Sequence, residues 1–186
     1  MTGRAGGRRA GRETFAERRE RRAAVDDPAV VLDAAARFLE TRSRSVTEVR
    51  RRLTGAGYRP ELVEGAVARL LELGILDDAA FARAWVESRD RAHPRGEIAL
   101  RRELRLKGID AAVIDEVLAE RGGESAAAPD ADAADRLLAR TSAVLTRIAD
   151  PRARRQRAYA LLARHGFDPD TASDAVRRYL AGADRD

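Results

Sequence analysis

Basic side chains gather in three stretches of this chain, residues 37–59, 89–107 and 147–164. Each stretch holds six or seven basic residues against one to three acidic ones, and the segments between them are acidic. A guanidinium group binds phosphate or carboxylate oxygens through paired hydrogen bonds. We therefore select ten basic residues from these stretches as candidates for contact with a protein or nucleic-acid partner: Arg50, Arg51, Arg52, Arg101, Arg102, Arg105, Lys107, Arg154, Arg155 and Arg157.

The alternative explanation of these charges is structural. Basic residues near the carboxyl end of a helix complement its dipole, and solvated helix faces are commonly charged. Charge alone does not separate the two explanations. The threefold recurrence of the pattern keeps the functional explanation open, because basic helices in a stack of similar units could form a discontinuous stripe suited to a phosphate backbone.

The elements that carry these residues are marked by a repeated phrase, Leu-x3-Gly followed by an apolar residue. It begins at Leu53, Leu104 and Leu162, with glycines at 57, 108 and 166. Apolar residues recur at helical spacing around each copy, and alternating strand patterns are nearly absent. A repeat of this kind predicts stacked copies of one small helical unit.

The predicted fold is all-α, with three tandem three-helix repeats in an elongated, curved array. Helix-starting Asp and Pro residues and helix-ending glycines place the repeats at residues 26–76, 77–121 and 131–182, with a linker over 122–130. Five aromatic residues lie on apolar stripes or just after the glycines, so we expect them to pack in cores: Phe38, Tyr58, Phe81, Trp85 and Phe167.

Residues 1–25 hold eight arginines against three glutamates, which accounts for the whole net charge of +5. We expect this segment to be a disordered basic Arg/Gly tail, whose deletion would leave the fold unaffected.

Catalytic patterns are missing from the sequence. It contains no cysteine and only two histidines, His93 and His165, and no phosphate-binding loop or nucleophile motif. The adjacent Asp77 and Asp78 are explained by the start of a helix. We expect a protein that is not an enzyme, has no catalytic residues, and needs no cofactor or metal. Because no apolar run approaches the length of a membrane span, we also expect a cytoplasmic protein. We expect it to be a monomer.

Two segments resemble the central signature of the RecX family. They are the stretch from Leu71 to Arg89, which contains Asp77-Asp78 and Phe81, and the stretch from Glu103 to Ile109. Residues 45–58 and 161–167 resemble the first and third repeats of that family. The resemblance covers about residues 29–181 and leaves the basic tail outside. Trp85 stands where the family more often has tyrosine.

The resemblance implies three tandem three-helix units without enzymatic activity. RecX proteins bind the RecA recombinase, chiefly as its filament on single-stranded DNA, and limit filament growth, ATP hydrolysis and strand exchange. Among our candidates, the family motif supports the region of Lys107. Two other interpretations stay open, a direct DNA-binding module, since three-helix units with a basic helix are similar to helix-turn-helix domains, and a scaffold for some other protein.

Overall fold

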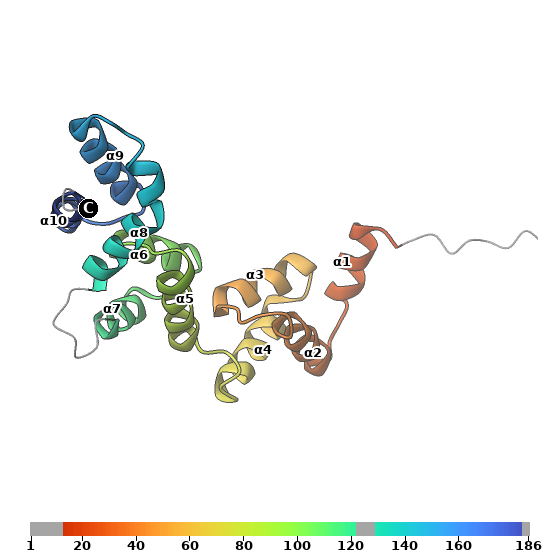
Figure 1. Cartoon of the computed structure of the whole chain (residues 1–186). Helices are drawn as coiled ribbons and strands as arrows, with labels where there is room; N and C mark the ends of the chain where they lie inside the picture. The colour runs from red at the N-terminus through yellow and green to blue at the C-terminus, as the bar shows by residue number, and fades with distance from the viewer. Residues whose placement is uncertain (1–12, 122–128, 184–186) are drawn as a thin grey trace, which may run out of the picture. The chain divides into compact units, whose positions relative to one another are not determined.

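The computed structural model describes residues 13–121 and 129–183, and every regular element in these ranges is an α-helix (Figure 1). The helices are α1 (Phe15–Ala23), α2 (Pro28–Leu39), α3 (Val46–Ala56), α4 (Pro60–Glu72), α5 (Asp78–Ala92), α6 (Glu97–Leu106), α7 (Ala111–Glu120), α8 (Pro129–Leu145), α9 (Pro151–Arg164) and α10 (Pro169–Ala183). This confirms the predicted all-α fold of tandem three-helix repeats, formed by α2–α4, α5–α7 and α8–α10. The elongated, curved form of the array stays a prediction.

The contacts of the chain divide it into two units. The first comprises residues 1–44 and 48–76, and the second comprises residues 45–47 and 77–186. The first unit therefore contains the first repeat together with α1. The second contains the other two repeats and the short segment at the start of α3.

In the first unit, α2 packs against α4. Asp27 caps α2 by accepting a hydrogen bond from the Ala29 amide, and Pro28 occupies the first helical position, where no amide donor is needed. The buried side chains of this repeat recur at helical spacing on all three helices. They are Val31, Ala35, Val49, Leu53, Val63, Ala66, Val67 and Leu70.

In the second unit, each repeat has a hydrophobic core of its own. The core of the second repeat is formed by buried residues of α5, α6 and α7 together with Ile109, and Trp85 packs against it. The core of the third repeat is formed by α8, α9 and α10 together with Phe167. Of the five aromatic residues expected in cores, Phe81 and Phe167 are buried, while Phe38, Tyr58 and Trp85 are half-buried.

The repeated phrase forms the same helix terminus three times. The amide after each glycine donates to the carbonyl of the phrase's leucine, over 3.3 Å from Tyr58 to Leu53, 3.1 Å from Ile109 to Leu104 and 3.3 Å from Phe167 to Leu162. The glycines have φ values of 104°, 78° and 80°. This is the Schellman termination, in which a glycine takes the left-handed conformation that a side chain would disfavour. The phrase therefore ends the middle helix of each repeat and sets the direction of the next one.

The prediction that residues 1–25 are a disordered tail is wrong for residues 15–23, which form α1; residues 1–12 lie outside the described residues. A capping box starts α1, because the Thr14 amide donates to Glu17 over 2.6 Å and the Glu17 amide donates to the Thr14 hydroxyl over 3.2 Å. The Arg22 guanidinium then reaches the Ala56 carbonyl at 3.4 Å and lies 5.7 Å from the centre of the Tyr58 ring.

The position of α1 gives the physical reason for its order. A β-carbon at Gly57 would lie 2.9 Å from the Arg19 carbonyl oxygen, so α1 covers the glycine turn of the first repeat (Figure 1). In the second unit, Gly108 is covered in the same way by Thr47, and Gly166 by Ala99 of α6. Helical arrays commonly need a capping element at their ends. Thus α1 covers the Gly57 turn of the first unit as α6 covers the Gly166 turn within the second unit.

The predicted linker is shorter than expected, because α8 begins at Pro129 and not after residue 130. Arg121 and Asp130, on either side of residues 122–128, form an ion pair at 2.5 Å, and Arg121 also pairs with Asp90 at 2.5 Å. The Arg121 side chain is only 4% exposed. Burial raises the pKa of Asp130. The pair with Asp130 joins the end of the second repeat to the first turn of the third, and the pair with Asp90 lies within the second repeat.

Candidate partner-binding surface on the middle helices

The first candidate cluster lies on α3, and its three arginines differ in their surroundings. Arg50 donates two hydrogen bonds to Glu64 on α4, at 2.6 and 2.8 Å. The hydrogen bond from Arg50 lowers the pKa of Glu64. Arg52 is exposed and lies 5.6 Å from the centre of the Phe38 ring. Arg51 is exposed and makes no ion pair with any residue of the described ranges.

The second cluster lies on α6 and at its end. Arg101 pairs with Asp115 on α7 and with Glu97 at 2.7 Å. Hydrogen bonds to Asp115 and Glu97 raise the pKa of Arg101. Arg102 and Arg105 are exposed, and neither makes an ion pair within the described part of the chain. Of the three arginines on α6, only Arg101 is therefore paired within the described residues.

Arg50 and Arg101 play the same part in successive repeats. Each lies three residues before the repeated leucine, and each pairs with a carboxylate fourteen residues further on, Glu64 or Asp115. Both pairs therefore tie the middle helix of a repeat to its third helix. Their guanidinium groups are engaged inside the repeat, so we assign them to positioning of the helices; a direct role in binding stays a prediction.

Lys107 belongs to a cluster of charges around Trp85. Its ammonium group lies 4.8 Å from the centre of the Trp85 ring, and the Arg89 guanidinium lies 4.4 Å from it. Glu103 accepts hydrogen bonds from Trp85 Nε1 at 2.9 Å and from Arg89 Nε at 2.7 Å. Trp85 packs against the core of the second repeat, as the sequence predicted, and its half-buried ring also lies near two cations, which stabilises both ring and charges.

The pKa of Glu103 follows from this cluster. Burial by itself would raise the pKa of this carboxyl group. The hydrogen bonds from Arg89 and Trp85 outweigh burial and hold the pKa below its ordinary value. Glu103 therefore stays ionised and fixes the orientation of both neighbouring side chains.

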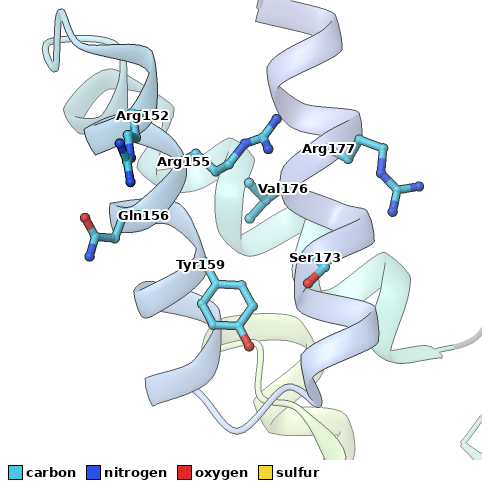
Figure 2. Close-up of a pocket in the computed structure, with 7 residues that line it drawn as sticks. All are labelled: Arg152, Arg155, Gln156, Tyr159, Ser173, Val176 and Arg177. Atoms are coloured by element: carbon cyan, nitrogen blue, oxygen red, sulfur yellow. The ribbon is translucent and has the colours of Figure 1, made fainter.

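The third cluster lies on α9 and does not match the first two in register. Aligning the repeated leucines places Tyr159 at the position of Arg50 and Arg101, so the predicted arginines lie about one turn earlier. Arg154 donates to the Ile148 carbonyl at 2.9 and 3.1 Å. Arg155 extends from α9 toward α10 (Figure 2).

Arg157 is exposed and makes no ion pair with a described residue. Sequence reasoning missed Tyr159, although the alignment of the three leucines contains the signal that identifies it. The structure thus divides the ten candidates into residues engaged within the fold and residues open to solvent. The exposed candidates are Arg51, Arg52, Arg102, Arg105, Arg155 and Arg157.

The described residues contain no group of acidic or histidine side chains that could hold a metal ion. His165, which precedes the third repeated glycine, has Nδ1 at 2.8 Å from the Leu161 carbonyl oxygen and so belongs to the helix terminus. None of the helices in the described ranges has the length and apolar character needed to cross a membrane.

Serial three-helix units, each with its own core and with exposed arginines on the middle helix, place the chain in the class of helical-repeat proteins. Family models agree at the level of single repeats. Residues 32–70 match the first three-helix domain of RecX, and residues 77–118 match the second.

Whole RecX proteins also match the chain. The chain is 36% identical over 150 residues to regulatory protein RecX of Mycobacterium sp. strain JLS, covering 78% of this chain and 79% of that protein. It is 38% identical over 120 residues to regulatory protein RecX of Streptomyces coelicolor, covering 64% and 61%. The crystal structure of RecX from Lactobacillus salivarius matches in fold with a TM-score of 0.71 at 18% identity, covering 82% of this chain and 96% of that one. The chain belongs to the RecX family.

Proposed function

We propose that this protein binds the RecA recombinase, as its filament on single-stranded DNA, and inhibits its ATP hydrolysis and strand exchange. This action would modulate DNA repair and homologous recombination in the cytoplasm. Membership of a family of regulatory proteins supports the proposal. The observation that carries it is the pair of exposed arginines at one repeat position, Arg51 on α3 and Arg102 on α6, neither with an ion pair in the described part of the chain.

The proposed mechanism is differential binding. A regulator can shift a filament between states only if its affinity for those states differs. Exposed arginines suit this role, since they reach carboxylates and phosphates over long distances and form forked hydrogen bonds. Within an interface, a few such anchors carry most of the binding energy. Arg51, Arg102 and Arg105 are the anchors we propose, with Lys107 at the end of the helix that carries Arg102 and Arg105.

The test is equilibrium binding of the labelled protein to RecA filaments assembled on single-stranded DNA. We expect the double variant Arg102→Glu/Arg105→Glu to bind at least tenfold more weakly, with its helix content unchanged. The control is Arg69→Glu/Arg136→Glu, which makes the same change in charge at exposed helical positions outside the predicted set. Equal binding by the two double variants would remove Arg102 and Arg105 from the interface.

A further inference from the structure

The third repeat contains a hollow at the position where the other repeats are closed by an ion pair. In the first two repeats, the middle and third helices are bridged by Arg50 with Glu64 and by Arg101 with Asp115. The corresponding residues of the third repeat, again fourteen apart, are Tyr159 and Ser173. No ion pair joins them, and a hollow of about 590 Å³ lies between α9 and α10. That volume is within the range of small-molecule sites.

The charge around this hollow is positive. Arg152 and Arg155 line it from α9 and Arg177 from α10, and none of the residues that line it is acidic. Arg177 is paired with Asp174 at 2.6 Å and points away from α9 (Figure 2). Arg152 and Arg155 are exposed and have no ion pair with any described residue. The hollow therefore presents the Arg155 guanidinium to an anion, and Arg152 adds a second uncompensated charge on the outer side of α9 (Figure 2).

An aromatic ring lies beside these charges. Tyr159 is 37% exposed, and its ring lies between α9 and α10, on the same side of α9 as Arg155 (Figure 2). Val176 gives the hollow an apolar wall, while the Gln156 amide and the Ser173 hydroxyl supply hydrogen-bond donors and acceptors. Sites for unpaired nucleotides commonly combine an aromatic ring with nearby arginines, because the base stacks on the ring and the phosphate binds the cations.

We propose that this hollow binds one nucleotide of a single-stranded nucleic acid. The base stacks on Tyr159, and the adjoining phosphate takes hydrogen bonds from Arg155, with Arg152 as a second nearby charge. A duplex cannot make this contact, because its bases are stacked and paired. An acidic peptide would satisfy the two arginines and leave the exposed tyrosine ring without a planar partner. For its biological setting, the inference rests on the proposed function, in which the strand is the one inside the filament.

The experiment measures binding of a fluorescein-labelled oligothymidine to the full chain by anisotropy, without recombinase, over a series of salt concentrations. Tyr159→Ala should weaken binding by roughly 5- to 150-fold, the effect of losing one stacked base. Tyr159→Phe, which keeps the ring, should stay within about twofold of wild type. Arg152→Gln/Arg155→Gln should flatten the slope of log affinity against log salt by about 0.7, the value for one lost phosphate contact on a single strand.

The matched control is Arg136→Gln, an exposed arginine of α8 that does not line the hollow, and it should leave both affinity and slope unchanged. A wild-type protein that fails to bind oligothymidine at low salt would overturn the inference. So would a Tyr159→Ala variant that binds like wild type, or a polyglutamate peptide that competes as well as the oligonucleotide. Circular dichroism of each variant separates lost binding from lost folding.

The outcome also separates this inference from the proposed function. If wild type restrains RecA while the Tyr159 and arginine variants bind oligothymidine normally, the nucleotide site is contradicted and the proposed function stands. If oligothymidine binding depends on Tyr159 while RecA is unaffected, the proposed function falls and the nucleotide site stands.

Discussion

Neighbouring arginines of α6 have different roles, although they look alike in the sequence. Arg101 pairs with two carboxylates, while Arg102 points to solvent. We expect Arg101→Gln to lower the free energy of unfolding by about 0.5–1 kcal/mol, the range for partly exposed ion pairs. Arg102→Gln should change it by less than about 0.5 kcal/mol. Urea denaturation of both variants checks this, and equal destabilisation would contradict the division.

Glu103 makes stability depend on pH. Its pKa is lowered in the folded protein from an ordinary value of 4.5, so its contribution is fully present above pH 4.5 and is lost as pH falls through the folded value. We expect Glu103→Gln to cost about 1–3 kcal/mol at pH 7, because hydrogen bonds from Trp85 and Arg89 weaken. The difference from wild type should shrink at pH 3.

Urea denaturation at the two pH values measures this difference. Glu61→Gln, at an exposed position of α4, should change the free energy of unfolding by less than about 0.5 kcal/mol at pH 7. A Glu103 effect of the same size at both pH values would argue against the ionised carboxylate as its source.

At the scale of elements, a turn can require glycine for two reasons, a positive φ and close contact with a neighbouring helix. Gly166 and Gly74 both have positive φ, 80° and 65°, but only Gly166 is crowded, by Ala99 of α6. Gly74→Ala should therefore cost about 1–2 kcal/mol from backbone conformation alone. Gly166→Ala should cost about 1–3 kcal/mol more, because the added methyl group forces α6 and the turn apart. Thermal melting of the two variants compares them, and similar losses would show that crowding is relieved cheaply.

The capping role of α1 changes the expectation for the N-terminal segment. Because α1 covers the Gly57 turn, deletion of residues 1–25 should cost about 1 kcal/mol and lower the melting temperature by about 2–4 °C. Thr14→Ala, which breaks the capping box, should give part of this loss. Glu20→Gln, at an exposed position of the same helix, serves as the control. An unchanged melting temperature after the deletion would mean that α1 does not stabilise the repeat.

At the scale of the whole molecule, local signals made most of the fold predictable. Asp-Pro helix starts and the Leu-x3-Gly terminus act within a few residues, so the helices of the three repeats follow from the sequence. The order of α1 does not, because its composition is that of a solvated segment and its contacts come from Ala56 and Tyr58, far along the chain.

The candidate site was predictable only in part, for a related reason. Charge clustering identified the helices that carry exposed arginines. It did not separate Arg101 from Arg102, because the partner of Arg101 lies on the next helix. The hollow beside Tyr159 lies where the first two repeats have an ion pair between the middle and third helices. Its position therefore depends on contacts between helices, which the sequence does not specify directly.

Under the proposed function, this helical-repeat protein restrains the RecA filament. The most direct measurement is the steady-state rate of ATP hydrolysis by RecA on single-stranded DNA, with and without this protein. We expect the rate to fall as the protein is added, with the Arg102→Glu/Arg105→Glu variant requiring at least tenfold more protein for the same inhibition. A rate that stays constant at saturating protein would contradict the proposed function.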